Sequence, residues 1–391
     1  MNILLTLILA GLTMVGPLAI DTYLPSFPAI GLSFDASPMM VQQTLSAFLF
    51  TFAFMMLFYG TLSDSFGRRP VILVSLAIYI AASVGAALAP SFGVLLACRV
   101  LQGLAAGAGS VISRAIVQDR FKGAEAQKIL SHIMMVFGLA PAIAPILGGA
   151  LQVAFGWRSI FWFLAAFGAL MFVVVVRWLP ESLPKRHPFH LGPIAANYWK
   201  VLRHRQFLLL SLAIGTSFGG FALYIGSAAY FIINILHLPE TAFGWLFIPL
   251  ISGMMIGSAL AGQFAHRYSQ TSLIWAGYGL MLVAALANIG YNLFFAAAVP
   301  WAVLPLFLYS FALSIAMPPM TLTALNYFPD HSGLASSMQS FIQMLLFALV
   351  SGVVAPLLFD SALKLACGVM GGLLLSALCW IQVRRDARTE R

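Results

Sequence analysis

Long apolar stretches follow one another along the whole chain, and this repetition constrains the fold more than any other feature. A helix needs about 20 mostly apolar residues to cross a bilayer. Candidate spans of that length lie at residues 3–23, 40–62, 70–89, 92–118, 128–151, 157–179, 207–236, 242–265, 271–292, 298–327, 332–359 and 362–382. Of the 391 residues, 61% are hydrophobic and only 8% are charged, which is too little charge for a water-soluble surface. The sequence therefore predicts an all-α membrane protein with twelve transmembrane helices.

The longest polar connection lies near the middle of the chain and predicts the domain organisation. Residues 180–206 separate an N-terminal six-helix half, residues 1–179, from a C-terminal six-helix half, residues 207–391, which ends in a short basic tail. The glycine-led segment 60–66 after the second span matches segment 262–268 after the eighth in its glycine, apolar and aromatic positions. This similarity favours a duplicated six-helix unit, in which two pseudo-symmetric halves surround a central cavity.

The distribution of Lys and Arg predicts the orientation. Sixteen of them fall in segments on one side of the predicted spans and two on the other, while Arg99 and Arg114 lie inside the fourth span. By the positive-inside rule, both termini and the central loop are expected in the cytoplasm. The net charge of +9 is explained by this topology, so no nucleic-acid partner is expected. The three cysteines lie in apolar runs without CxxC spacing, so neither a disulfide framework nor a metal site is expected.

A charged turn joins the second and third spans. Its glycines suit close packing and a tight turn, and Pro70 suits the first position of the next helix. The candidate gate residues of this turn are Gly60, Asp64, Gly67, Arg68 and Arg69. The segment resembles the signature loop of the major facilitator superfamily, whose charges hold one side of the protein closed. In that family an acid after the fourth span often contacts this loop, which implies a pair between Asp119 and Arg68; a solvated charge cluster is the alternative.

Two charged residues inside predicted spans are candidates for proton coupling. Asp21 lies in the first span and Arg99 in the fourth. Pro25 is expected to end the first helix, which would place Asp21 about one turn from the outer face, at a depth compatible with Arg99. A charge within the membrane is costly and normally faces a polar cavity or a partner. The fourth span also resembles the superfamily motif whose arginine is implicated in proton transfer. The alternatives are an interfacial, solvated Asp21 and an Arg99 that binds backbone carbonyls of a neighbouring helix.

The fifth span is rich in small residues and prolines, which bend a helix and allow close packing. These positions are Gly138, Pro141, Pro145, Gly148 and Gly149. The span resembles the antiporter motif of exporters in the superfamily, although Ala144 replaces the usual glycine before the proline. Together with the first-span segment around Asp21, these motifs resemble the bicyclomycin- and chloramphenicol-resistance (Bcr/CflA-like) type of drug:proton antiporter. This specific resemblance covers about the first 180 residues.

The second half contains no evident charge inside its spans, so the coupling chemistry is expected in the first half. Tyr230, Gln339 and Gln343 are candidates for contacts with the substrate, because a phenol and two long amides within a membrane need a partner or a wet cavity.

These features predict a proton-coupled secondary active transporter that exports amphipathic drugs or toxic metabolites across the bacterial inner membrane by alternating access. The proton gradient would supply the energy without a cofactor, and one chain would function as a monomer. GxxxxGK[ST], HExxH and GxSxG motifs are missing, so the sequence gives no support for ATP-driven or hydrolytic chemistry and predicts no catalytic residues. An uptake symporter for a small nutrient is the main alternative. A membrane-bound enzyme or a sensor is less favoured, because the histidines are scattered and the longest loop is too short for a soluble domain.

Overall fold

The protein is all-helical in the part that the computed structural model describes, which covers residues 3–121, 123–183, 191–264, 267–328 and 332–389. Twelve helical segments in these ranges are long and apolar enough to cross a bilayer, which confirms the predicted number of spans. The chain divides into two compact units, Met1–His190 and Leu191–Arg391. Lys122, Lys185, Arg186 and Arg391, which are among the basic residues counted above, lie outside the described residues.

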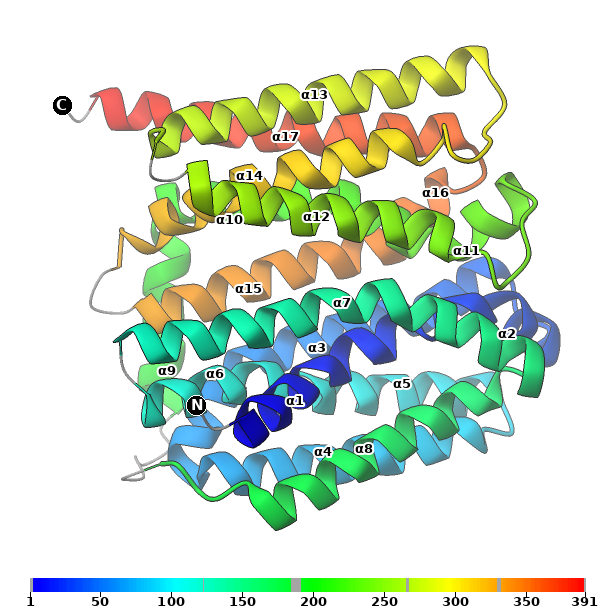
Figure 1. Cartoon of the computed structure of the whole chain (residues 1–391), viewed down its shortest axis with the longest axis vertical. Coiled ribbons are helices and arrows are strands. Elements are labelled where there is room, and N and C mark those ends of the chain that lie inside the picture. The colour runs from blue at the N-terminus through cyan, green and yellow to red at the C-terminus, as the bar shows by residue number, and fades with distance from the viewer. Residues whose placement is uncertain (1–2, 122, 184–190, 265–266, 329–331, 390–391) are drawn as a thin grey trace. The chain divides into compact units, whose positions relative to one another are not determined.

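The first unit contains the first six spans (Figure 1). Its helices are α1 (Ile3–Asp21), α2 (Phe27–Phe34), α3 (Pro38–Phe66), α4 (Arg68–Ala87), α5 (Phe92–Ala106), α6 (Ala108–Arg120), α7 (Gly123–Phe155) and α8 (Arg158–Trp178). The first span consists of α1 and α2, and the fourth consists of α5 and α6. Within the unit, α4 packs against α5 and α8, α3 against α5, and α1 against α7.

The second unit contains the other six spans. Its helices are α9 (Leu191–Arg203), α10 (Arg205–Gly226), α11 (Ala228–Tyr230), α12 (Gly244–Phe264), α13 (Gln270–Phe294), α14 (Leu304–Leu325), α15 (Ser332–Leu349), α16 (Ala355–Leu358) and α17 (Ala362–Thr389). Two π-helical turns, Phe231–Ile235 and Val350–Val354, follow α11 and α15. Helix α14 packs against α12 and α13, and α10 packs against α15 and α17.

The sequence positions several helix starts directly. Ser37, Ser91 and Ser269 precede α3, α5 and α13, and each side chain accepts a hydrogen bond from the backbone N–H three residues later. Such a serine satisfies one of the free N–H groups at a helix start. Gly67 alone separates α3 from α4, and its φ of +102° is a conformation that favours glycine. The charged turn is therefore tight, as its glycine predicted.

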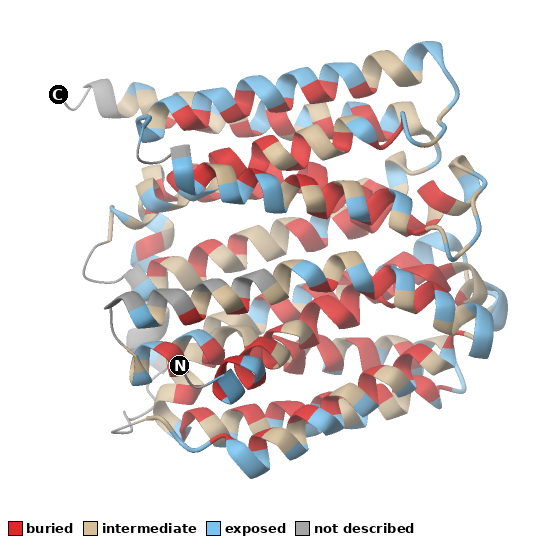
Figure 2. Ribbon diagram, in the orientation of Figure 1, coloured by how far each residue is buried: buried red, intermediate tan, exposed pale blue. Residues whose placement is uncertain are grey.

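Helix α13 shows why these helices belong in lipid. Its buried residues recur in pairs every turn, and Trp275, Leu282 and Val283 on its other face are exposed. Figure 2 shows this alternation of buried and exposed residues along the helix. Because both faces are apolar, the exposed face suits contact with acyl chains and not with water.

Two local expectations differ from the structure. The first is that Pro25 ends the first helical segment, which is wrong: α1 ends at Asp21, a 3-10 turn covers Leu24–Ser26, and α2 continues the span to Phe34. Proline fits there because the first residues of a helical turn do not need their N–H groups. Asp21 therefore lies at a break inside a 32-residue segment and not beside its end.

The second difference concerns the expected connecting loop 180–206. Helix α9 lies within it, from Leu191 to Arg203. Residues 184–190 of that loop lie outside the described residues.

Candidate functional site

Arg99 is a fully buried charge at the centre of the first unit. It projects from α5 with 0% exposure, and its guanidinium carbon lies 4.4 Å from the ring centroids of both Tyr23 and Phe48. Cation–π attraction stabilises a guanidinium between two aromatic faces. Gly103, one turn later on α5, allows this arrangement, because a Cβ at that position would overlap the backbone of Phe48 and the side chain of Thr51 on α3. Close approach of α3 and α5 thus encloses the charge.

Hydrogen bonds connect Arg99 to two neighbouring helices. Its Nη1 donates to the carbonyl of Ala19 on α1 at 3.1 Å and to Oε1 of Gln102 at 3.0 Å. Gln102 Nε2 in turn donates to Ser83 Oγ on α4 at 2.8 Å. The Nε and Nη2 atoms of Arg99 and the hydroxyl of Tyr79 are buried without a partner. Arg99 therefore links α1, α5 and α4 and keeps unused hydrogen-bond donors.

Asp21 is the last residue of α1 and is only 3% exposed. Its Oδ1 is buried without a hydrogen-bond partner, and no ion pair joins its carboxylate to Arg99 in the described part of the chain. The structure places Arg99 on the carbonyl of Ala19, two residues before Asp21, so it shows the backbone contact that was the structural alternative for this arginine. Asp21 and Arg99 thus both lie at the end of α1, but they do not form an ion pair.

The fifth-span motif reaches this helix end. A Cβ at Gly148 of α7 would overlap the backbone carbonyl of Thr22, so the glycine allows α7 to touch the residue after Asp21. Ser26 Oγ donates to Gln152 Oε1 one turn further along α7 at 2.9 Å. The helix contains Pro141 and Pro145 and continues through both.

The other motif positions of α7 behave differently from one another. Ala144 and Gly149 are buried. A Cβ at Gly138 would meet no atom within 4 Å. Close packing therefore explains Gly148 but not Gly138.

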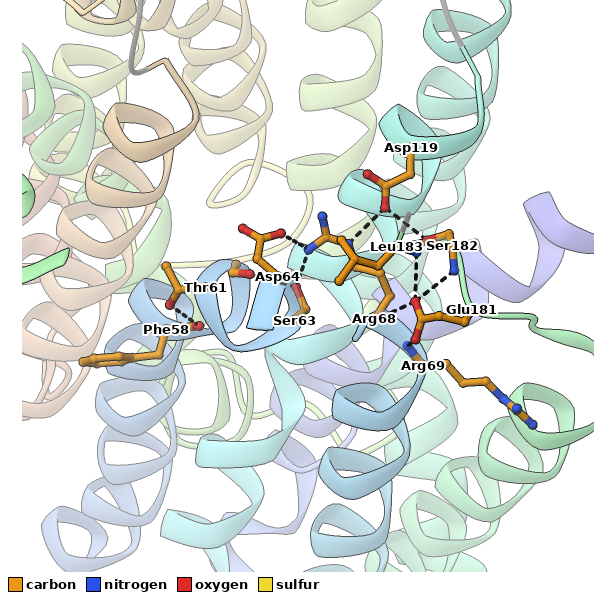
Figure 3. A network of polar contacts seen from close by, with 11 residues as sticks. Phe58, Thr61, Ser63, Asp64, Arg68, Arg69, Asp119, Glu181, Ser182 and Leu183 are labelled. Atoms are coloured by element: carbon orange, nitrogen blue, oxygen red, sulfur yellow. Dashed lines mark hydrogen bonds and ion pairs between the residues drawn. The ribbon is translucent and has the colours of Figure 1, made fainter. Parts of the chain in front are cut away.

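Arg68 forms a charged network at the turn between α3 and α4 (Figure 3). Its Nη1 lies 2.5 Å from Oδ1 of Asp64 and donates to Ser63 Oγ at 2.6 Å, while its Nε donates to Oδ2 of Asp119 at 3.0 Å. The side chain of Arg68 is 8% exposed and that of Asp64 is 44% exposed. The structure thus brings Asp119 and Arg68 together, while their role as a gate stays a prediction.

Glu181 completes this network and was missed in the sequence. Its carboxylate accepts hydrogen bonds from the backbone N–H groups of Arg68 and Arg69 at 3.1 and 3.2 Å. These N–H groups belong to the first turn of α4, which carries no acid of its own. An anion at this position satisfies free donors and complements the helix dipole. The available signal was an acid directly after Pro180, at the end of the sixth span.

The segment around Glu181 also ties the network to other helix ends. Ser182 Oγ donates to Oδ2 of Asp119 at 3.1 Å, and Arg69 Nη2 donates to the carbonyl of Val176 on α8 at 2.7 Å. A Cβ at Gly67 would lie 2.6 Å from Oε2 of Glu181, so this position requires glycine for space as well as for its φ. A Cβ at Gly60 would meet no atom within 4 Å, so the expectation of close packing at Gly60 is not met.

The three candidate substrate contacts of the second unit lie on two helices: Tyr230 ends α11, which follows the seventh span Arg205–Gly226, and the two glutamines lie on α15. Tyr230 stacks on Phe359 with ring centroids 4.5 Å apart. Gln339 on α15 is 6% exposed, its Nε2 donates to Thr321 Oγ1 at 2.9 Å, and its Oε1 is buried without a partner. Gln343 lies one turn later on the same helix and is partly exposed. The two glutamines share a helix face, and contact with a substrate stays a prediction for all three residues.

Comparisons with known proteins agree on one family. The model of the Major Facilitator Superfamily matches residues 9–382. The bicyclomycin resistance protein homolog of Haemophilus influenzae is 29% identical over 378 residues, which cover 94% of this chain and 93% of the relative. The uncharacterized MFS-type transporter YdgK of Bacillus subtilis is 32% identical over 90% of this chain and 88% of its own length. Multidrug resistance protein D of Escherichia coli is 28% identical over 97% of this chain and 95% of its own length.

A solved structure supports the fold. The human organic anion transporter MFSD10 (TETRAN) superposes with a TM-score of 0.71, covering 97% of this chain and 99% of its own, at 20% sequence identity.

Proposed function

The chain belongs to the major facilitator superfamily, and on this premise we propose that it is a proton-coupled secondary transporter that exports amphipathic drugs or toxic metabolites. Relatives named for bicyclomycin resistance and multidrug resistance align over nearly the whole chain and support this substrate class. The proposed location is the bacterial inner membrane, with both termini in the cytoplasm as the positive-inside bias indicates. The proton gradient is the energy source, no catalytic step is involved, and one chain is the transport unit.

The observation that carries this proposal is the unpartnered carboxyl of Asp21. An unpaired charge is costly inside a membrane protein, so such an acid marks a proton path more often than a structural contact. Asp21 lies at the break between α1 and α2, next to the contact between Gly148 and Thr22. A change in how α7 packs there would change the access of water to the carboxyl. Movement of the span and protonation of Asp21 are thereby coupled.

Arg99 has a different role in this proposal. It holds the carbonyl of Ala19 and stands between two aromatic rings, so it fixes the end of α1 instead of moving with a solute. Its unpartnered donors can attract the Asp21 carboxylate once the proton has left. In this proposal, the network of Arg68, Asp119 and Glu181 stabilises the conformation of the transporter that is open to the periplasm.

The proposal is tested by drug-dependent dissipation of a pH gradient in inverted membrane vesicles. Asp21→Asn should abolish the drug-linked proton flux while the protein stays folded. Asp35→Asn is the matched control, because Asp35 is an exposed acid directly after the same span, with φ of +48°, a conformation that asparagine tolerates. Unchanged flux in Asp21→Asn would refute the role of Asp21. Proton movement in the direction of substrate uptake would favour the symporter alternative.

A further inference from the structure

The fourth span changes its exposed surface where α5 gives way to α6. The side chains that α5 exposes include Val94, Ala97 and Leu101, which suit contact with lipid. Those exposed on α6 are Arg114, Gln118 and Arg120, and all three are polar. Arg114 and Gln118 are four residues apart and therefore share one face of the helix. One transmembrane segment thus presents an apolar surface in its first part and a polar surface in its second.

The polar face of α6 is not a continuation of the lipid-facing side of α5. Thirteen residues separate Leu101 from Arg114, and at about 100° per residue the two side chains point roughly 140° apart around the axis. The other side of α6 packs on α1, where a Cβ at Gly109 would overlap the backbone of Leu12 and Ser113 Oγ donates to the carbonyl of Leu9 at 3.3 Å. Arg114 and Leu101 therefore face different surroundings.

Arg114 places a charge inside the span. It lies six residues before the end of α6, about 9 Å along the axis, and helical side chains lean toward the N-terminus, here into the span. No hydrogen bond, ion pair or ring contact joins its guanidinium to a described residue. A charged side chain facing lipid costs at least about 2.5–3.5 kcal/mol, so the polar face of α6 is placed more favourably along an aqueous path than against acyl chains.

Arg114 also differs from the other ionisable groups deep in the spans of the first unit. Arg99 is 0% exposed and Asp21 is 3% exposed, so neither side chain offers surface to a solute in this conformation. Arg114 is exposed, its donors have no partner among the residues that the structure describes, and Gln118 adds a side-chain amide on the same face. A guanidinium with an adjacent amide matches the oxygen atoms of an anionic group.

We propose that Arg114 and Gln118 form a binding position for the anionic group of an amphipathic substrate, a carboxylate, sulfonate or phosphate. This inference rests on the proposed transport function and names the substrate class that the first unit favours. Neutral compounds would bind through the same apolar contacts but would gain nothing from the guanidinium. Selectivity between an acid and its ester is therefore the property that Arg114 controls.

The test uses the purified full-length protein and one boron-dipyrromethene dye, whose fluorescent core is uncharged, in its carboxylic-acid and methyl-ester forms, with binding followed by fluorescence polarisation. The wild-type protein should bind the acid more tightly than the ester. Arg114→Gln should weaken binding of the acid by about tenfold or more, the effect of losing a hydrogen bond to a charged group, and leave the ester affinity unchanged. Arg114→Lys should retain part of the preference. Arg177→Gln, which removes an exposed charge at the end of α8, should behave like the wild type.

Three results would overturn the inference: equal binding of acid and ester by the wild type, equal weakening of both by Arg114→Gln, or no binding of either form. Unchanged affinity for the ester shows that the variant is folded. The proposed export function is tested separately by the drug-linked proton flux of the wild type and of Asp21→Asn. That experiment involves neither the dye nor a change at Arg114.

Discussion

The two units differ in what they bury. Charged groups with an unpartnered buried atom, among the described residues, are Asp21, Arg69 and Arg99, and all belong to the first unit. In the second unit the described ion pairs, Arg205 with Asp386 and Lys364 with Asp360, lie at helix ends. The first unit therefore keeps charges that can change partner or protonation, whereas the second confines its charges to the ends of its spans.

The interior of the second unit is joined by neutral groups instead. Ser376 Oγ on α17 donates to the carbonyl of Ala213 at 2.6 Å and lies 2.6 Å from the hydroxyl of Tyr278 and 2.5 Å from Ser217 Oγ. Tyr309 donates to the carbonyl of Ser217 at 2.8 Å, next to the space left by Gly220. These bonds connect α10, α13, α14 and α17. The two helical units therefore differ in the buried polarity they contain: the first buries charged groups with unpartnered atoms, and the second buries neutral groups whose hydrogen bonds join its helices.

Replacing Arg99 should give the largest effect. Arg99→Gln removes a charge that is hydrogen-bonded to Ala19 and Gln102, contacts worth about 1.5–3 kcal/mol each, so drug-linked proton flux in vesicles should fall by about tenfold or more. Arg99→Lys should not restore it, because an ammonium lacks the planar fork that fits between two rings. If Arg99→Gln showed the same drug-linked proton flux as the wild type, the claim that proton coupling depends on Arg99 in the first unit would be wrong.

The second-largest effect is expected on stability, from a substitution at Gly67 in the turn between α3 and α4. Gly67→Ala should lower the stability by about 1–3 kcal/mol, since the position has a positive φ and the added Cβ would press on Glu181. Gly60→Ala is the matched control and should be neutral or slightly stabilising, because it lies in a helix with open space around it. Thermal unfolding in detergent distinguishes them, and equal melting temperatures would contradict the structure of the turn.

A substitution in the second unit tests whether its buried polar groups contribute to stability and not to proton coupling. Ser376→Ala should lower the stability by about 1–2 kcal/mol through loss of its hydrogen bonds but leave the proton-to-drug coupling intact. Thermal unfolding and vesicle flux on the same preparation give both quantities. A folded Ser376→Ala protein without coupling would show that the second unit also takes part in proton chemistry.

The smallest effect is expected at Glu181. Glu181→Gln keeps only one of the two oxygens that accept from the N–H groups of Arg68 and Arg69, and it removes the negative charge at the start of α4, which is worth about 0.3–1 kcal/mol. The melting temperature should fall slightly, and Glu181→Ala should lower it further. Identical melting of both variants and the wild type would show that the carboxylate does not hold the turn.

Much of the fold could be predicted from the sequence because a bilayer imposes one length on every span. Apolar runs therefore identified all twelve spans, and the charged turn was recognised from Gly67 and its arginines. The failure at Pro25 has a local cause, since proline ends one helix and begins another equally well and only the residues after it decide.

The site was predicted less completely, because its contacts join residues that are far apart in sequence. Glu181 lies 113 residues from the N–H group of Arg68, and Phe48 reaches Arg99 only when α3 and α5 meet at Gly103. Tyr23 was visible next to Asp21, but nothing local indicated that its ring covers a guanidinium. Helical spacing reveals a face of one helix, while the choice of neighbouring helix depends on tertiary packing.

Proton release on drug binding tests the assignment of coupling to the first unit most directly. The purified protein, in weakly buffered detergent solution with a pH dye, receives a saturating amount of an exported drug. The wild type, Asp35→Asn and Ser376→Ala should each release protons, and Asp21→Asn should bind the drug without release. Proton release from Asp21→Asn equal to that of the wild type would contradict this account.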